Sequence, residues 1–518
     1  MRVDRTAGGV TRRSTLLGLA GLGLAAVSGC RLAVDEARGA TGGGGARRGG
    51  TLTVAINVDA QPDSVQAHNA NSVIWRRLVF ETLTAYDSSG TPQPLLATDW
   101  EIRDGGRTVA IDLRDDVRFH TGRPMTARDI MFSLTRSADP VARSQARAAT
   151  SLITDMTADG DHALRIRLSR PASNLFDAFE LASVVDEESA DGIADGSAMI
   201  GTGPFRWGTW NPGSGLTLVR NDDYRVPERP YLDRVEQPTI TDPTALITAI
   251  RSGRADIAYG ASPLDARGAS TDGRYEINAG VTVDYAIGMD VTSAPFDDIR
   301  VRRAVAHAID RDRIADQVFA GYGRPTSLWW SEKEAGWSQE QSDTYDYRPD
   351  RARDLIREAG ATGTEVAIVT TPIQAVQSTA QIVRYNLEEA GLRVRTQVLD
   401  PVEYNSRQVE GNLGQLFING YGIADLSAAT FATHPAFAAE QNPSHFTTAE
   451  YADLVTRAAT ATPDERVSAV QALGGYMLDQ AFNISIATAQ STIVRSKRVR
   501  DVRQTFLGSF IFDDTYVV

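Results

Sequence analysis

The chain has 518 residues, enough for two or three domains with sizeable hydrophobic cores. Hydrophobic residues make up 42% and charged residues 23%, as in ordinary soluble proteins, and the net charge of −13 argues against a nucleic-acid-binding surface. The single cysteine, Cys30, excludes a disulfide framework and a cysteine-based metal site. There is no HExxH motif, although a metal site made by His434 and His445 stays open as an alternative.

Residues 1–29 have the pattern of an export signal. Arg12 and Arg13 precede an apolar run over residues 16–27, which is too short to cross a bilayer of about 30 Å as a helix. The paired arginines favour export by the twin-arginine route, with the general secretory route as the alternative. The run ends in Val-Ser-Gly-Cys, which resembles a lipobox, so we expect Cys30 to be lipidated and to become the mature N-terminus. A chance cysteine is the alternative.

Residues 30–50 are predicted to form a flexible tether. Seven of the twenty residues in 31–50 are glycine, and such a segment does not pack into a core. A glycine-rich chain of this length has an end-to-end distance of roughly 25 Å. The tether would therefore keep a folded domain close to a membrane surface.

The first half of the chain reads as strands separated by helices and turns. Strands are predicted over residues 51–58, 107–113 and 117–120, and a helix over residues 72–83. Thr126 and Asp129 have the spacing of a capping box, which predicts a helix over residues 127–136. Gly201 and Gly203 flank a short Gly-Thr-Gly-Pro loop and predict a close approach of backbone to another element.

Residues 285–314 carry the most specific pattern in the chain. A strand over residues 285–289 is followed by a proline turn, two aspartates and a helix whose buried face includes Val301 and Val305. The run PFDDIRVRRAVAHAID resembles the signature of the extracytoplasmic solute-binding proteins of peptide-type ABC importers, solute-binding family 5. Asp290 stands where that family usually has asparagine.

A β-α-β unit follows in the second half. Residues 365–370 and 392–398 are β-branched or alternating strands, and residues 374–390 form the helix between them, so the two strands are expected to be parallel. A further strand over residues 415–419 runs into a loop over residues 420–425.

The resemblance covers residues 50–518 and implies an α/β chain with the type II periplasmic-binding-protein fold, two lobes joined by a hinge. Lobe one would span residues 51–283, with an inserted subdomain at about 84–198. Lobe two would span residues 284–486, and residues 487–518 would return to lobe one.

The resemblance also implies a ligand site in the loop over residues 420–425. By its position in that loop, Asp425 matches the aspartate that pairs with the α-ammonium of the ligand in peptide-binding members, and Tyr421 and Gly422 share its loop. An alternative is that Asp425 is the N-cap of a helix over residues 426–431. Trp329 and Trp330 are candidates either to stack on a ligand or to pack in lobe two.

The function implied is capture of a peptide or peptide-like solute between the lobes and its delivery to ABC permease subunits. The alternatives are a ligand-sensing lipoprotein, or an importer subunit for a sugar, an opine or a metal complex. No G-x-S-x-G motif is present, so we expect no enzyme activity and no cofactor. We expect a monomer outside the cytoplasm, anchored by lipid to the outer face of the cell membrane.

Overall fold

The computed structural model describes residues 47–142 and 144–518. The predicted signal peptide, the lipidation residue Cys30 and most of the predicted tether lie outside these described residues. Within the described ranges, no helix is long and apolar enough to cross a membrane.

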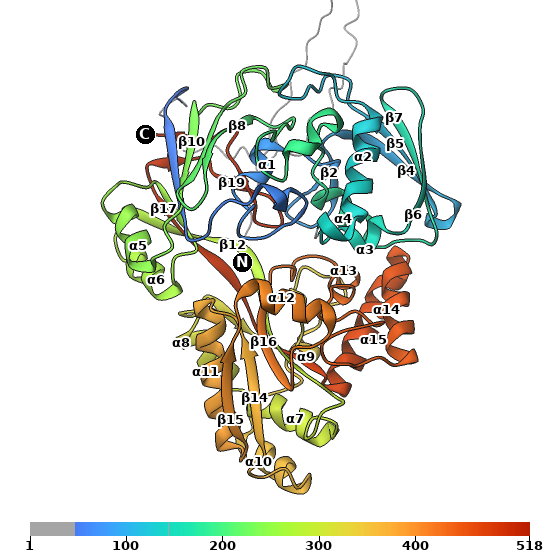
Figure 1. The fold of residues 1–518 in the computed structure, drawn as a ribbon, viewed down its shortest axis with the longest axis vertical. Coiled ribbons are helices and arrows are strands. Elements are labelled where there is room, and N and C mark those ends of the chain that lie inside the picture. Colours follow the sequence, from blue (N-terminus) through green and yellow to red (C-terminus); the bar gives the residue numbers. More distant parts are fainter. Residues whose placement is uncertain (1–46, 143) are drawn as a thin grey trace, which may run out of the picture. The chain divides into compact units, whose positions relative to one another are not determined.

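One sheet of 11 strands extends through the described chain, with the order β15-β14-β16-β12-β17-β11-β1-β10-β9-β8 and with β13 paired to β17 (Figure 1). Its strands are β1 (Thr51–Ile56), β8 (Phe205–Asn211), β9 (Gly215–Arg220), β10 (Arg234–Pro238), β11 (Ile257–Tyr259), β12 (Tyr275–Met289), β13 (Gly323–Pro325), β14 (Glu365–Thr370), β15 (Arg393–Val398), β16 (Leu416–Tyr421) and β17 (Asn483–Ser496). The antiparallel neighbours β12 and β17 have 15 and 14 residues and connect the upper and lower lobes in Figure 1.

The upper half of the sheet belongs to lobe one. β1 is parallel to β10 and β11, and β8, β9 and β10 are antiparallel neighbours. Leu52, Val54 and Ile56 on β1 are buried, and they join one hydrophobic cluster with residues from 232 to 281 and from 493 to 512. The helices beside this half are α1 (Arg76–Val79), α5 (Pro243–Arg251) and α6 (Pro263–Ser270).

A second, four-stranded antiparallel sheet with the order β4-β5-β7-β6 forms a subdomain with its own core. Its strands are β4 (Ala97–Arg103), β5 (Thr108–Leu113), β6 (Ile153–Ala158) and β7 (Ala163–Leu168), and its helices are α2 (Ala127–Ala138), α3 (Arg147–Thr150) and α4 (Leu175–Leu181).

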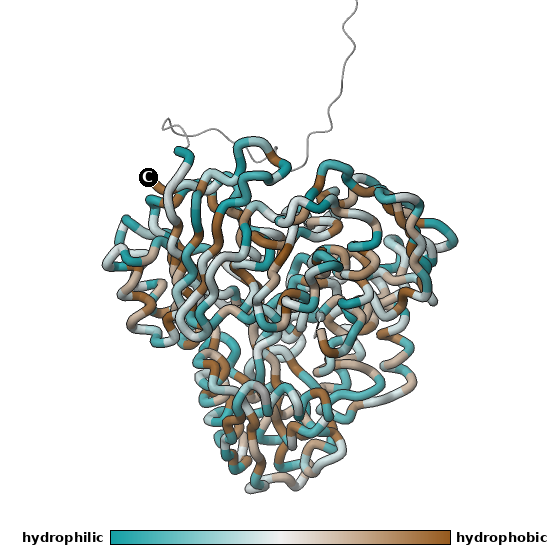
Figure 2. Tube along the Cα trace, turned by 45° about the horizontal axis from the view of Figure 1, so that its top comes forward, coloured by the Kyte–Doolittle hydropathy of each residue, from teal (hydrophilic) through white to brown (hydrophobic). Residues whose placement is uncertain are grey.

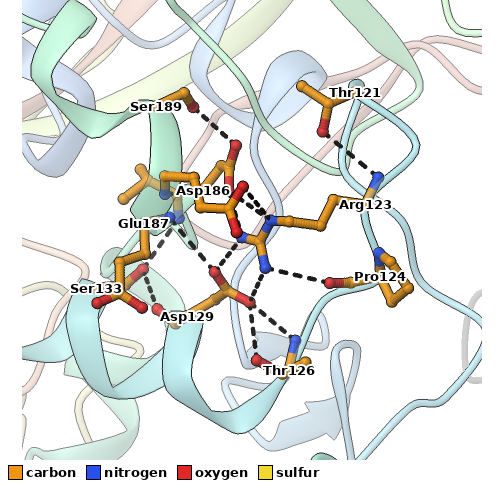
Figure 3. Close-up of polar contacts among 11 residues, drawn as sticks. Thr121, Arg123, Pro124, Thr126, Asp129, Ser133, Asp186, Glu187 and Ser189 are labelled. Carbon is orange, nitrogen blue, oxygen red and sulfur yellow. Dashed lines mark hydrogen bonds and ion pairs between the residues drawn. The ribbon is translucent and has the colours of Figure 1, made fainter.

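The predicted capping box starts α2. The Asp129 carboxylate accepts a hydrogen bond from the Thr126 amide at 2.9 Å, and the side chain of Thr126 caps the helix in return (Figure 3). Arg123 forms ion pairs with both Asp129 and Asp186. The arginine thereby links the start of α2 to the segment after α4 (Figure 3). The capping-box prediction is confirmed.

Lobe two contains the predicted β-α-β unit. β14 is parallel to β15 in a register of six residue pairs, with α11 (Gln374–Glu389) between them in the chain, and β14 is also parallel to β16. The other helices of this part are α7 (Ile299–Ala308), α8 (Arg311–Gln317), α9 (Gln339–Ser342), α10 (Pro349–Glu358), α12 (Pro401–Glu410), α13 (Ala428–Ala432), α14 (Ala449–Thr460) and α15 (Pro463–Gln480). Val301 and Val305 of α7 are buried as their spacing predicted.

The remaining elements are short. The paired strands are β2 (Thr84–Tyr86) with β3 (Pro92–Pro94), β18 (Val499–Arg500) with β21 (Tyr516–Val517), and β19 (Arg503–Gln504) with β20 (Phe510–Ile511). The 3-10 turns are η2 (Pro62–Gln66), η3 (Asp104–Gly106), η4 (Pro140–Ala142) and η5 (Glu187–Gly192).

In Figure 2 hydrophobic runs are short and interrupted by hydrophilic residues, as expected for elements with one buried face.

Two predicted elements are wrong in extent. Only α1 (Arg76–Val79) forms where a helix over residues 72–83 was expected, and residues 117–120 form no named strand.

The Gly-Thr-Gly-Pro loop packs its backbone on α1: a Cβ at Gly201 would lie 2.0 Å from the Val79 carbonyl oxygen. The Gly203 amide donates to that oxygen at 2.9 Å, so the carbonyl at the end of α1 is satisfied by a distant loop rather than by a further helical turn.

The lobe boundaries stay proposals. β12 has irregular register between Ala279 and Thr282 and again between Tyr285 and Ala286, beside the proposed boundary after residue 283. Hydrophobic residues from 286 to 489 gather in one large cluster, which also includes Ala146, Ala149, Ala178, Leu181 and Leu507 from outside the proposed lobe two.

Candidate functional site

A cavity of about 210 Å³ lies where the long strands β12 and β17 pass between the lobes. The strands contribute Thr282 from β12 and residues 488–490 from β17. The other lining residues come from the segment around β13 and from the loop after β16: Tyr322, Arg324, Thr326, Trp330, Ser331, Glu332, Lys333, Trp337 and Asp425.

Backbone hydrogen bonds hold the two loops of the cavity side by side. β13 pairs with β17 at Ala487–Ala489, so the segment that follows β13 starts at the edge of the sheet. Further along, the Ser331 amide donates to the Ala424 carbonyl at 2.8 Å, next to Asp425 in the chain. The positions of Lys333 and Asp425 are therefore set by backbone contacts as well as by their side chains.

Asp425 is the most buried carboxylate of the cavity, with a side chain only 5% exposed. Its Oδ2 accepts hydrogen bonds from the Thr282 hydroxyl at 2.6 Å and from the Lys333 ammonium at 2.9 Å. Its Oδ1 is buried and has no hydrogen-bond partner among the described residues. One oxygen of this carboxylate therefore receives no hydrogen bond from the described part of the chain.

Lys333 is a site residue that the sequence reasoning missed. Its ammonium also donates to the Phe506 carbonyl at 3.3 Å and lies 4.3 Å from the centre of the Phe506 ring. Phe506 belongs to the segment predicted to return to lobe one, so with these boundaries Lys333 would connect the two lobes. The available signal was composition, because only two of the 53 basic residues are lysines.

Arg324 and Glu332 form a second ion pair at the cavity. The guanidinium of Arg324 lies 4.6 Å from the centre of the Trp337 ring and donates to Gln339 at 3.1 Å. Arg324 thus brings to the cavity wall a guanidinium that is paired with a carboxylate and stacked on an aromatic ring.

The aromatic candidates divide between cavity and core. Trp330 lines the cavity, and its indole N–H is buried without a partner among the described residues. Trp329 is fully buried and donates to the Asn483 side chain at 2.9 Å, which fits the packing alternative. Tyr421 packs on Phe437, and neither it nor Gly422 is among the lining residues.

The helix-cap alternative for Asp425 is wrong. The following helix is α13 (Ala428–Ala432), and its N-cap is Ser427, whose hydroxyl accepts from the Thr430 amide at 3.2 Å. Asp425 lies two residues before this N-cap, because the chain turns at residues 423–426 before α13 begins.

The helix α13 also contacts the subdomain of lobe one, as the proximity of α4 and α13 in Figure 1 shows. The Asp177 carboxylate on α4 accepts from the Ser427 amide at 3.1 Å, from the Ser427 hydroxyl at 2.5 Å and from the Thr430 hydroxyl at 2.6 Å. The Asn174 amide donates to the same threonine at 3.0 Å. The two lobes are therefore joined by buried hydrogen bonds on the subdomain side.

The histidine alternative for a metal site finds no support in the described residues, where no group of three metal-ligating side chains occurs. His434 accepts from the Ala436 amide at 3.2 Å, and burial lowers its pKa to about 4. His445 contacts the Asp290 carboxylate at 2.9 Å. Asp290, which departs from the family pattern, also stabilises the turn at residues 290–293. Its carboxylate accepts hydrogen bonds from the Thr292 amide and the Ser293 hydroxyl.

Curated relatives are periplasmic solute-binding proteins. The chain is 28% identical over 348 residues to "Probable peptide ABC transporter periplasmic-binding protein y4tO" of Sinorhizobium fredii, covering 61% of this chain and 64% of the relative. It is 24% identical over 491 residues to "Glutathione-binding protein GsiB" of Shigella dysenteriae, covering 89% of this chain and 92% of the relative.

Solved structures share the fold. The periplasmic binding protein DppA from Helicobacter pylori, in complex with peptide STSA, superposes with a TM-score of 0.80 at 21% identity, covering 91% of this chain and 98% of that chain. The binding protein AgaA from A. tumefacien R10, in complex with agropinic acid, has a TM-score of 0.79 at 22% identity, covering 90% and 99%. The expected type II periplasmic-binding-protein fold is confirmed.

The family model described as "Bacterial extracellular solute-binding proteins, family 5 Middle" matches residues 91–442, which include the PFDD signature and the loop of Asp425. That match spans most of the chain and agrees with the two-lobed fold and the inter-lobe cavity, so the chain belongs to the bacterial extracellular solute-binding proteins of family 5.

Proposed function

We propose that this protein captures a short peptide or peptide-like solute between its lobes and hands it to the permease subunits of an ABC importer. The observation that carries the proposal is Asp425, a buried carboxylate with one unpartnered oxygen at a cavity between the lobes. Buried polar atoms without partners are rare in folded proteins, and a solute donor would satisfy this one.

The cavity favours a small solute. Its volume of about 210 Å³ lies below the roughly 300–1,000 Å³ of sites for drug-sized ligands. Polar groups converge from several elements, and the aromatic rings of Trp330 and Trp337 supply apolar walls. Such a mixture suits the backbone and side chain of one or two residues.

The hydrogen bonds between α4 and α13 suit a protein that closes on its ligand. A solute that contacts both lobes adds to these bonds and shifts the population toward the closed form. Closed lobes then form a combined surface for the permease. We propose that the protein acts by binding alone, without catalysis.

We further propose that the protein works as a lipid-anchored monomer outside the cytoplasm. Support comes from the lipobox-like Val-Ser-Gly-Cys run that ends at Cys30 and from the glycine-rich stretch after it. Lipidation of Cys30 would hold the protein beside its membrane partner.

The direct test is identification of the natural solute. Protein is produced with its own leader, purified without denaturant and then unfolded, and the released small molecules are identified by mass spectrometry. We expect peptides or amide-linked peptide-like compounds, enriched over a parallel preparation of Asp425→Ala. Release of sugars or metal complexes alone would contradict the proposal.

A second measurement separates import from sensing. Cells lacking the protein should fail to accumulate the identified solute, labelled with a heavy isotope, and a plasmid copy should restore uptake. Normal uptake in the deletion strain would favour the sensing alternative.

A further inference from the structure

Lysine is rare in this protein, and one of its two lysines lies at the candidate site. The chain contains Lys333 and Lys497, while the other basic residues among the total of 53 are arginines. An ammonium differs from a guanidinium because it is a compact point charge with three donors rather than a planar fork. The Lys333 side chain, whose ammonium contacts Asp425, is therefore chemically equivalent to the amino terminus of a peptide.

The surroundings of the Lys333 ammonium are those that bind a primary amine. It donates to the Asp425 carboxylate at 2.9 Å and to the Phe506 carbonyl at 3.3 Å, and it lies 4.3 Å from the centre of the Phe506 ring. A carboxylate, a carbonyl and an aromatic face together match the donors and the charge of an ammonium. The protein fills this amine site with its own side chain.

The pairing decides which solute groups Asp425 can accept. Its Oδ2 is occupied by Thr282 and Lys333, and its charge is balanced by Lys333. An incoming ammonium would have to displace Lys333 or share one carboxylate with it, and like charges at one site repel. The free Oδ1 needs only a neutral N–H donor, such as the amide of a blocked amino end.

The cavity offers no other free carboxylate for a solute ammonium. Among the described residues that line it, the acids are Asp425 and Glu332, and Glu332 is paired with Arg324. Both negative charges are thus balanced within the chain.

We propose that Lys333 occupies the ammonium position at Asp425, so that the site selects peptide-like solutes whose amino end is blocked, such as N-acylated peptides. This inference rests on the proposed function and narrows its substrate class. Lys333 is a specificity-determining residue, because its charge decides between a charged and a neutral amino end.

The test compares two pools of short peptides of identical mixed sequence, one with free amino ends and one N-acetylated. Solute-free protein, stripped by unfolding and refolded, receives both pools at equal concentration, and native mass spectrometry weighs the bound peptides. Wild-type protein should retain acetylated peptides at least tenfold over free ones. Lys333→Met should shift that ratio at least tenfold toward free amines, because Asp425 then lacks a cation.

Lys497→Met is the matched control, since it removes the other lysine, whose backbone amide donates to the Arg274 carbonyl at 2.9 Å. It should keep the wild-type ratio. Lys333→Gln provides the same comparison if Lys333→Met does not refold, as judged by circular dichroism, because glutamine keeps a donor for Asp425 and removes the charge.

The outcomes separate this inference from the function on which it rests. Preference of the wild type for free amines, or an unchanged ratio in both Lys333 variants, overturns the inference and leaves peptide binding intact. Retention of neither pool by the wild type overturns the inference and the proposed function together.

Discussion

Asp425 does not cap α13, and its proposed contact with the ligand can be tested by substitution. Asp425→Ala should lower solute affinity by about ten- to a hundredfold, since a hydrogen bond to a charged group is worth about 1.5–3 kcal/mol. Calorimetric titration with the solute released from wild-type protein measures this loss.

Ser427→Ala shows what loss of the helix cap does to stability. It removes the N-cap of α13 and also a buried hydrogen bond to Asp177, so it should cost about 1 kcal/mol of stability or more, whereas Asp425→Ala leaves this cap in place. Thermal melts of both variants show the difference. A large stability loss in Asp425→Ala with unchanged affinity would remove Asp425 from the site.

His120 predicts a pH dependence of stability. Burial lowers its pKa from 6.5 to about 4, while its ring accepts from the Gly201 amide at 3.3 Å and contacts the Gly203 carbonyl at 3.0 Å. Below about pH 6.5 the unfolded chain binds a proton that the native state refuses, so the free energy of unfolding falls as the pH falls.

Between about pH 7.5 and about pH 5.5 this residue alone should remove about 1.4 kcal/mol from the free energy of unfolding. Urea titrations of wild type and His120→Asn at both pH values measure the free energy of unfolding. On acidification this free energy should fall by about 1.4 kcal/mol less in the variant than in the wild type, whatever the absolute stability of the variant. His162→Asn, at an exposed turn, should retain the wild-type difference. Equal differences in wild type and His120→Asn would contradict the assignment.

At the scale of elements, we expect the contact between α4 and α13 to control closure. Asp177 accepts three hydrogen bonds from α13 and its N-cap and one from the Tyr86 hydroxyl at 2.7 Å. Asp177→Asn removes the charge that strengthens these bonds. If this contact stabilises the closed form more than the open form, weakening it shifts the population toward open lobes.

We expect Asp177→Asn to enlarge the radius of gyration measured by X-ray scattering. Solute binding should weaken by about tenfold or more, because each hydrogen bond to a charged group contributes about 1.5 kcal/mol or more. Asp112→Asn is the matched control, because Asp112 is an exposed residue of β5 in the same subdomain. An unchanged scattering curve and affinity in Asp177→Asn would show that α4 and α13 do not hold the lobes together.

For the whole molecule, the expected anchor at Cys30 decides where the protein works. Cys30→Ser should release the protein from the membrane fraction, because a serine cannot carry the thioether-linked lipid. Immunoblots of membrane and soluble fractions measure the release, and Ser28→Ala, which keeps the cysteine, should stay with the membrane. Retention of Cys30→Ser after signal cleavage would contradict lipid anchoring.

Local interactions let the sequence determine much of the architecture. The capping box of α2, the buried face of α7 and the unit from β14 to β15 depend on residues a few positions apart, or on a periodicity that a short segment carries. The family followed from the PFDD signature for the same reason, since its residues are contiguous. The loop of Asp425 could be singled out because it follows a recognisable strand, and Asp425 lines the cavity, while its contact with a ligand stays a prediction.

Only the tertiary structure decided what surrounds that loop. Lys333 and Asp425 are 92 positions apart, and Asp177 and Ser427 are 250 apart, so no local pattern indicates that they meet. α1 is short for a similar reason, since its final carbonyl is satisfied by Gly203, a residue far along the chain. Side-chain contacts between distant segments depend on how strands β12 and β17 bring the lobes together, and that packing is not encoded in any single stretch.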